Sequence, residues 1–195
     1  IAAILENDSD SNRNDFKTAT FYSISNCQPG LKNISFGNFL IKQVVQELQA
    51  EFPSIKSFVT LSPVSGMSRW LDSSENEDTT GLHMLKEEVK SLVLDPAVLE
   101  QHDTVIKRLV FNYLLTTKRG IYPFDSVARF HLGNGASLHQ INTNADTSKN
   151  GLKQSRGAMV NYLYDLRYLE RNHESYITEG EVHYNDKLKS LLIKE

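Results

Sequence analysis

The segment between residues 19 and 61 constrains the fold of this 195-residue chain more than any other. β-Branched and aromatic residues over residues 19–25, and apolar residues over residues 55–61, predict two strands. Between them, apolar residues recur at helical spacing over residues 39–51, with Asn38 as the expected N-cap. A strand, a glycine-bearing loop, a helix and a strand form a βαβ-type unit. We therefore expect an α/β (α+β) protein whose two strands lie in one open sheet.

The remainder of the chain carries further helical and strand patterns. An acidic stretch over residues 72–80 predicts a linker. The pair Asn134 and Gly135 is typical of a tight β-hairpin turn, here between strands at residues 127–132 and 136–142. In that hairpin His131 would lie opposite Leu138. Helical spacing predicts four more helices, at residues 82–94, 103–116, 158–170 and 185–193.

The chain begins with a short apolar run at residues 1–5 and without an initiator methionine. We expect a terminal strand there and a chain that lacks its N-terminal part. The predicted organisation is one partial domain in three units, at residues 1–71, 72–126 and 127–195.

Composition excludes several classes of protein. A hydrophobic fraction of 39% with 23% charged residues is typical of a globular chain. The net charge of -3 argues against sequence-independent nucleic-acid binding, and no apolar run reaches the roughly 20 residues of a membrane span. The single cysteine, Cys27, excludes an internal disulfide and fits a reducing compartment. The six histidines show no metal-ligand spacing, so no metal site is expected.

The loop before the first predicted helix is a candidate anion site. A strand that leads into a loop and then a helix exposes free backbone N–H groups at the positive end of the helix dipole. Such a site suits a pyrophosphate, and Lys32 or Lys42 would add positive charge. An ordinary solvated helix start remains the alternative.

Ser62 and His131 are two further candidates, each with a structural alternative. Ser62 stands at the end of a predicted strand before Pro63, where its hydroxyl can donate into a cleft or simply end the strand. No Gly-x-Ser-x-Gly elbow surrounds it, so a hydrolase nucleophile is not predicted. His131 is flanked by Phe130 and Leu132, and a lone strand histidine is often only a packed residue.

Several stretches together resemble the malonyl-CoA decarboxylase family, in the same order and across residues 16–176. The matching stretches are residues 21–25, 37–42, 61–63, 128–136 and 159–164. The chain departs from the family pattern at Asn33 and Ser35, where some relatives carry glycine and glutamate. It also has Asp125 and Ser126 where an Asn-Pro pair is common.

The resemblance implies a GNAT-like, acyl-CoA-binding mixed sheet flanked by helices, with a helical insertion. It implies decarboxylation of malonyl-CoA to acetyl-CoA and CO2 in fatty-acid metabolism, without a cofactor. Ser62 would hydrogen-bond the malonyl or enolate group, His131 would protonate the enolate carbon, and Tyr164 would lie near the active site. The CoA-binding loop would comprise Lys32, Asn33, Ile34, Ser35, Phe36, Gly37 and Asn38.

Two other functions stay open at this point. One is a GNAT-type acyltransferase that moves an acyl group to an amine, and the other is a non-catalytic CoA-binding or assembly module. The resemblance further implies a homo-oligomer formed through a region absent from this chain. It implies an intracellular location, which is mitochondrial, peroxisomal or cytosolic; the chain does not end in Ser-Lys-Leu.

Overall fold

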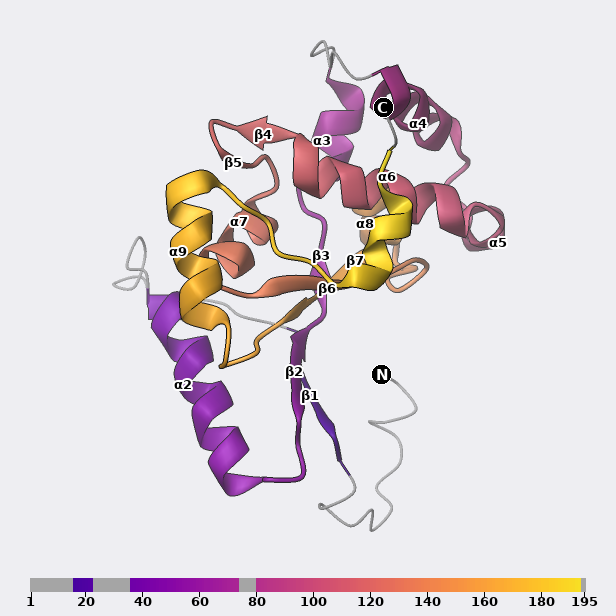
Figure 1. The fold of residues 1–195 in the computed structure, drawn as a ribbon. Helices are drawn as coiled ribbons and strands as arrows, with labels where there is room; N and C mark the ends of the chain where they lie inside the picture. Colours follow the sequence, from indigo (N-terminus) through magenta and orange to yellow (C-terminus); the bar gives the residue numbers. More distant parts are fainter. Residues whose placement is uncertain (1–15, 23–35, 74–79, 194–195) are drawn as a thin grey trace, which may run out of the picture.

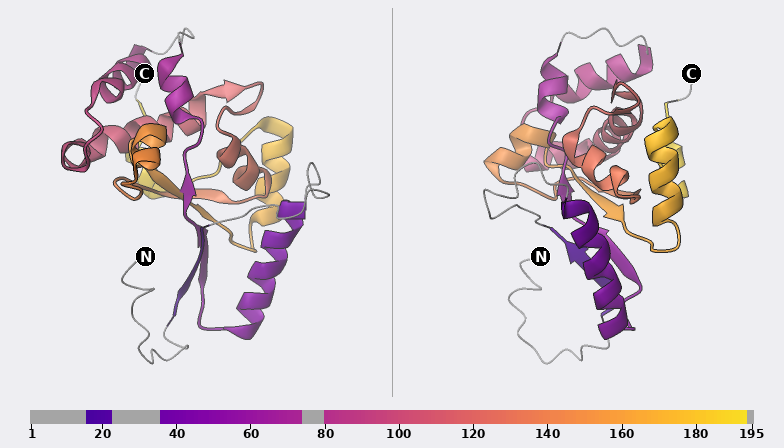
Figure 2. Two further views of the ribbon diagram at one scale, coloured as in Figure 1. Left: turned by 180° about the vertical axis from the view of Figure 1, so that it is seen from behind. Right: turned by 90° about the vertical axis from the view of Figure 1, so that its left-hand side faces the viewer.

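A computed structural model describes residues 16–22, 36–73 and 80–193 of the chain. A five-stranded mixed sheet runs through its middle (Figure 1). Figures 1 and 2 show α2 alongside β1 and β2 at one end of the molecule, with the helices α3 to α6 gathered at the other. The strands of this sheet are β1 (Thr18–Phe21), β2 (Ser57–Thr60), β3 (Ser62–Pro63), β6 (Ser137–Asn142) and β7 (Met159–Leu163).

Helices of several lengths surround the sheet. They are α2 (Phe36–Glu51), α3 (Met67–Asp72), α4 (Thr80–Ser91), α5 (Pro96–Gln101), α6 (Asp103–Thr116), α7 (Ser126–Gly133), α8 (Lys149–Ser155), α9 (Leu169–Glu179) and the 3-10 helix η3 (Asp186–Leu191). A small second sheet pairs β4 (Lys118–Arg119) with β5 (Tyr122–Pro123). Within these ranges, no helix is both long and apolar enough to cross a membrane.

The predicted strand–helix–strand unit is confirmed within the described residues. β1 and β2 pair in parallel, with Thr18 opposite Ser57 and Phe21 opposite Thr60, and α2 connects them. The predicted helix begins earlier than expected, at Phe36, so Asn38 lies inside its first turn and is not the N-cap. The expected strand at residues 1–5 lies outside the described residues, as do residues 23–25.

The chain breaks its strand between β2 and β3, and this break positions Ser62. β2 and β3 both pair antiparallel with β7, through Val59 opposite Leu163 and Ser62 opposite Val160. β6 pairs with β7 on the other edge. β7 is therefore hydrogen-bonded on both sides, and Ser62 lies in the short strand β3, which pairs with β7 alone in this sheet among the described residues.

Helix α6 matches the predicted range 103–116 and forms much of the core. Its residues Ile106, Leu109, Val110 and Phe111 are completely buried. A helix that is apolar on most sides must be covered on most sides.

The division of the chain at residues 71 and 126 stays a prediction.

The predicted hairpin around Asn134 and Gly135 is wrong in its first strand, because residues 126–133 form helix α7. The Asp125 side chain caps this helix by accepting hydrogen bonds from the N–H groups of Val127 and Ala128. The Asn-Gly pair ends the helix and does not turn between strands: Gly135 has φ +84°, and a Cβ there would lie 2.0 Å from the Leu169 carbonyl oxygen. Only the second strand of the prediction exists, as β6.

The predicted helix at residues 158–170 is also wrong. Residues 159–163 form β7, in which buried and half-buried side chains alternate as they do in a strand. The apolar residues there also fit a helical period. The segment forms a strand because neighbouring strands offer hydrogen bonds on both sides of it. The last predicted helix is present as the 3-10 helix η3, and the predicted helix at residues 82–94 is present as α4. Helices α3, α5, α8 and α9 were not predicted.

Candidate active site

Ser62 and His131 are 69 positions apart in the sequence and in direct contact in the fold. Ser62 lies in β3, and His131 lies in the last turn of α7. The distance between Ser62 Oγ and His131 Nε2 is 3.0 Å. Both side chains are buried, with 5% and 4% of their surface exposed, so bulk water does not compete for this hydrogen bond.

Two more hydroxyl groups extend this contact into a line of four polar side chains. Tyr164 Oη lies 2.8 Å from His131 Nδ1, so both ring nitrogens have a partner. At the other end, Ser62 Oγ donates a hydrogen bond to Thr60 Oγ1 at 2.9 Å. The line therefore runs from Tyr164 through His131 and Ser62 to Thr60.

Aromatic rings enclose the imidazole. Tyr162 stacks on His131 with ring centroids 4.7 Å apart and planes 22° apart, and Phe130 meets it edge-on at 5.0 Å. Burial in this setting lowers the pKa of His131 to about 4, because an apolar environment disfavours the charged ring. At neutral pH the free site therefore holds a neutral imidazole with one ring proton.

Tyr164 and Asn134 form the far end of the site. Burial raises the pKa of Tyr164, so its hydroxyl stays protonated and can donate. The side-chain amide of Asn134 acts in the opposite direction on that pKa. Asn134 is fully buried, and neither of its amide atoms has a hydrogen-bond partner of normal geometry among the described residues.

Asp125 holds the two halves of the site together. Its Oδ1 caps the first turn of α7, the helix that carries His131. Its Oδ2 accepts from the backbone N–H of Gly66 at 2.7 Å and from Ser65 Oγ at 3.3 Å, in the loop that follows β3. One buried carboxylate thus fixes both the helix of His131 and the loop that continues from Ser62.

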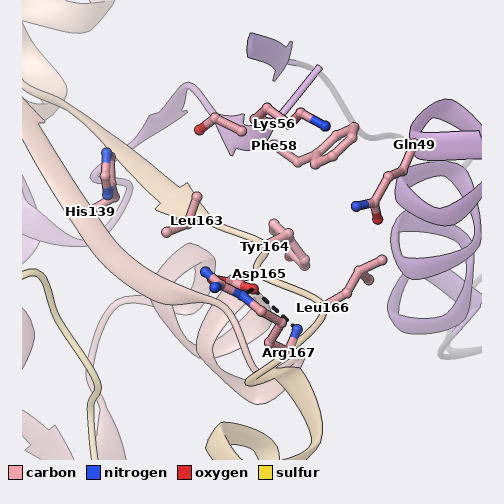
Figure 3. A pocket seen from close by; sticks show the side chains of 10 residues that line it. Gln49, Lys56, Phe58, His139, Leu163, Tyr164, Asp165, Leu166 and Arg167 are labelled. Carbon is pink, nitrogen blue, oxygen red and sulfur yellow. Dashed lines mark hydrogen bonds and ion pairs between the residues drawn. The ribbon is translucent and has the colours of Figure 1, made fainter. Parts of the chain in front are cut away.

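A cavity of about 440 Å³ adjoins Tyr164 at the end of β7. Figure 3 shows its walls, with Gln49 extending from α2 and the Asp165–Arg167 ion pair below it. Tyr164 lines this cavity and also bonds His131, so one residue contacts both. The lining residues are Gln49, Lys56, Ser57, Phe58, His139, Leu163, Tyr164, Asp165, Leu166 and Arg167.

The structure brings together three of the predicted site residues: Ser62, His131 and Tyr164. The expected position of His131 opposite Leu138 in a hairpin is wrong, because His131 lies on a helix. In the predicted CoA-binding loop, Phe36, Gly37 and Asn38 form the first turn of α2. The other loop residues lie outside the described residues: Lys32, Asn33, Ile34 and Ser35.

The sequence patterns did not identify Thr60, Tyr162 and Asp125 as parts of the site. A signal for Thr60 exists, because residues two apart on a strand share a face and Thr60 stands two before Ser62. A signal for Asp125 also exists, because aspartate is a preferred helix N-cap. Over the described residues, no group of three or more His, Cys, Asp or Glu side chains could hold a metal ion.

The fold and the site define a class of protein: mixed α/β proteins with a buried Ser–His pair beside a break in the central sheet. The sequence model of the malonyl-CoA decarboxylase C-terminal domain matches residues 1–195, and the chain belongs to this family.

Known relatives agree with this assignment. The chain is 36% identical to mitochondrial malonyl-CoA decarboxylase of Mus musculus and 34% identical to that of Rattus norvegicus, over 92% of this chain and 42% of each relative. The crystal structure of malonyl-CoA decarboxylase from Rhodopseudomonas palustris matches 92% of this chain with a TM-score of 0.78 and 41% identity. That from Agrobacterium vitis matches 91% with a TM-score of 0.76 and 42% identity. This chain spans 43% and 46% of those two structures.

Proposed function

We propose that this chain carries the site at which malonyl-CoA is decarboxylated to acetyl-CoA and CO2, in fatty-acid metabolism. The observation that carries the proposal is the 3.0 Å contact between Ser62 Oγ and His131 Nε2 in a member of this family. Two polar groups this close can touch one malonyl group at the same time. The relatives named malonyl-CoA decarboxylase supply the substrate class.

The chemistry explains why a serine and a histidine suffice. Loss of CO2 leaves the enolate of acetyl-CoA, in which the thioester carbonyl takes up the electron pair. The site must hold the carboxylate out of the thioester plane, stabilise the enolate oxygen and protonate the carbon. A preorganised donor such as Ser62 contributes ~3–4 kcal/mol at the oxyanion, and a positioned proton donor such as His131 contributes ~10²–10⁴-fold in rate.

A neutral imidazole is competent as this donor. The thioester enolate is a much stronger base than the imidazolate anion, so His131 does not need a second ring proton before the transfer. Burial keeps the pKa of His131 low and the ring neutral, as in other enzymes that use a neutral histidine as an electrophile. The hydroxyl of Tyr164 at Nδ1 stabilises the charge that develops on the ring.

We also propose that the mixed sheet is a GNAT-like acyl-CoA scaffold and that the start of α2 binds CoA phosphates. The first turn of a helix offers free N–H groups and the positive end of the dipole. Phe36, Gly37 and Asn38 form that turn, and the remaining residues of this proposed subsite are Lys32, Asn33, Ile34 and Ser35.

We further propose that the protein acts inside the cell, because the rodent relatives are named mitochondrial. A homo-oligomer, which the family resemblance implies, is part of the same proposal.

Incubation of the purified protein with malonyl-CoA alone tests the proposed reaction. Decarboxylation yields CO2 and acetyl-CoA in equal amounts without an acceptor. An acyltransferase would leave malonyl-CoA intact until an amine is added and would then release CoA. Binding of malonyl-CoA without any turnover would identify a binding module. Either of the last two results contradicts the proposal.

A further inference from the structure

The line of hydrogen bonds from Tyr164 to Thr60 has a fixed direction. Thr60 Oγ1 accepts a hydrogen bond from the backbone N–H of Tyr162 at 3.1 Å, and a backbone N–H can only donate. Thr60 Oγ1 also accepts from Ser62 Oγ at 2.9 Å. The hydrogen of the Ser62 hydroxyl therefore points at Thr60.

This direction determines which nitrogen of His131 carries the proton. A serine hydroxyl has one hydrogen, so Ser62 Oγ can only accept in its 3.0 Å contact with His131 Nε2. The proton of the neutral ring must then be on Nε2. Nδ1 is left as an acceptor, and Tyr164 Oη donates to it at 2.8 Å. The Tyr164 hydrogen thus points at Nδ1, the ring hydrogen at Ser62 and the Ser62 hydrogen at Thr60.

We infer that Thr60 is a positioning residue that directs the Ser62 hydroxyl away from His131 and so keeps the transferable proton on Nε2. This inference rests on the proposed decarboxylation, in which Nε2 delivers that proton to the enolate carbon. Nε2 is the nitrogen beside Ser62, the residue proposed to hold the malonyl group. A proton on Nδ1 would face Tyr164 and could not reach the substrate.

The opposite direction would give different chemistry. If Ser62 donated to Nε2, the ring would act as a base and the serine would become an activated nucleophile, as in serine hydrolases. In the free site Thr60 removes that option, because its oxygen takes the serine hydrogen. When the malonyl group binds, the serine hydrogen turns from Thr60 to the more basic enolate oxygen, and Nε2 keeps its proton. One hydroxyl thus separates a proton-donating Ser–His pair from a nucleophile-activating pair.

Thr60 can hold the Ser62 hydroxyl in one direction because its backbone is fixed and its side chain is shielded from solvent. It is 1% exposed at the end of β2, where bulk water cannot replace its hydroxyl. The side-chain amide of Asn161 on β7 donates to the Thr60 carbonyl oxygen at 2.5 Å, which fixes the backbone. Because Thr60 and Ser62 are alternate residues of adjoining strands, their hydroxyls face the same side.

Thr60→Val and Thr60→Ser test the inference by kinetics. Valine keeps the shape and removes the acceptor, so we expect kcat to fall by at least ~10-fold with KM within about threefold of the unaltered protein. Serine restores the oxygen, so we expect kcat within about threefold of the unaltered value. Thr117→Val is the matched control, because the Thr117 hydroxyl is also buried but has no partner among the described residues.

The ¹⁵N chemical shifts of the His131 ring in the unaltered protein provide a second readout, which does not depend on the folding of Thr60→Val. His131→Asn identifies the signal. A protonated Nε2 with an acceptor Nδ1 in the unaltered protein supports the inference, and a mixed or reversed tautomer is expected in Thr60→Val. A protonated Nδ1 in the unaltered protein overturns it, as does an unchanged kcat in Thr60→Val. Failure of the unaltered protein to decarboxylate malonyl-CoA would instead contradict the proposed function and leave the tautomer result valid.

Discussion

The carboxylate of Asp125 accepts a 2.7 Å hydrogen bond from the backbone N–H of Gly66. Gly66 lies four residues after Ser62, and Asp125 lies six residues before His131. Through its other oxygen, Asp125 caps α7. The relative position of the two proposed catalytic residues therefore depends on a carboxylate that belongs to neither.

Asp125→Ala should cost more than the loss of an ordinary helix cap. The change removes a cap worth ~1 kcal/mol and leaves the buried Gly66 N–H unpaired, so we expect a loss of ~2–4 kcal/mol in the free energy of unfolding. Asp95→Ala is the matched control, because Asp95 caps α5 in the same way and its side chain bonds only the first turn of that helix among the described residues. The free energy of unfolding, measured with urea, and kcat should both fall for Asp125→Ala, and kcat should not fall for Asp95→Ala. Equal effects of the two changes on kcat would contradict the linking role.

Gly66→Ala should destabilise the fold mainly through a clash with Tyr113, since the next atom, Asp125 Oδ2, would lie 3.3 Å from the added Cβ. A Cβ at Gly66 would lie 2.5 Å from Tyr113 Oη, although the backbone there has φ -91° and suits any residue. Overpacking of this kind costs ~1–3 kcal/mol. Tyr113→Phe removes the hydroxyl, which is buried and has no hydrogen-bond partner among the described residues, so alone it should be close to neutral.

The double variant Gly66→Ala with Tyr113→Phe should therefore recover more than half of the lost free energy of unfolding. A double-mutant cycle from thermal or urea unfolding measures this coupling. Additive effects of the two changes would show that the Tyr113 hydroxyl is not the cause.

The stability of the protein should depend on pH through His131. Its pKa is lowered from 6.5 to about 4 in the folded state, so the unfolded chain binds more protons between these values. The contribution of His131 to the free energy of unfolding should therefore be fully present above about pH 6.5. It should decrease as the pH falls toward 4, by up to about 3 kcal/mol. Urea unfolding at several pH values measures the slope, and His131→Gln should reduce it. An identical slope in both proteins would contradict the buried neutral histidine.

The sequence predicts those elements whose pattern is local. The βαβ-type unit and helix α6 carry clear apolar periods, and both are present. Helix α7 was missed because the Asn-Gly pair is also a hairpin signal, and only the Asp125 cap favours a helix. β7 was missed because its hydrogen bonds come from β2, β3 and β6, which are distant in sequence.

The candidate site was also predictable only where the sequence signal is local. Ser62 and His131 were each selected beside a purely structural alternative, and neither residue type predicts a contact across 69 positions. Tyr164 was selected only through the family resemblance. Thr60 was not selected, because its role depends on the direction of a hydrogen bond that only the folded structure defines.

The turnover number of His131→Asn, with Ser62→Ala beside it, tests the central claim most directly. Loss of the proton donor should lower kcat for malonyl-CoA by ~100-fold or more, and loss of the Ser62 donor should lower it by ~10²–10³-fold. His102→Asn serves as the control, because the His102 ring bonds only the Val98 carbonyl oxygen on α5 among the described residues. The account predicts full activity in that control and little in the other two. A kcat within about threefold of the unaltered protein in both Ser62→Ala and His131→Asn would contradict it.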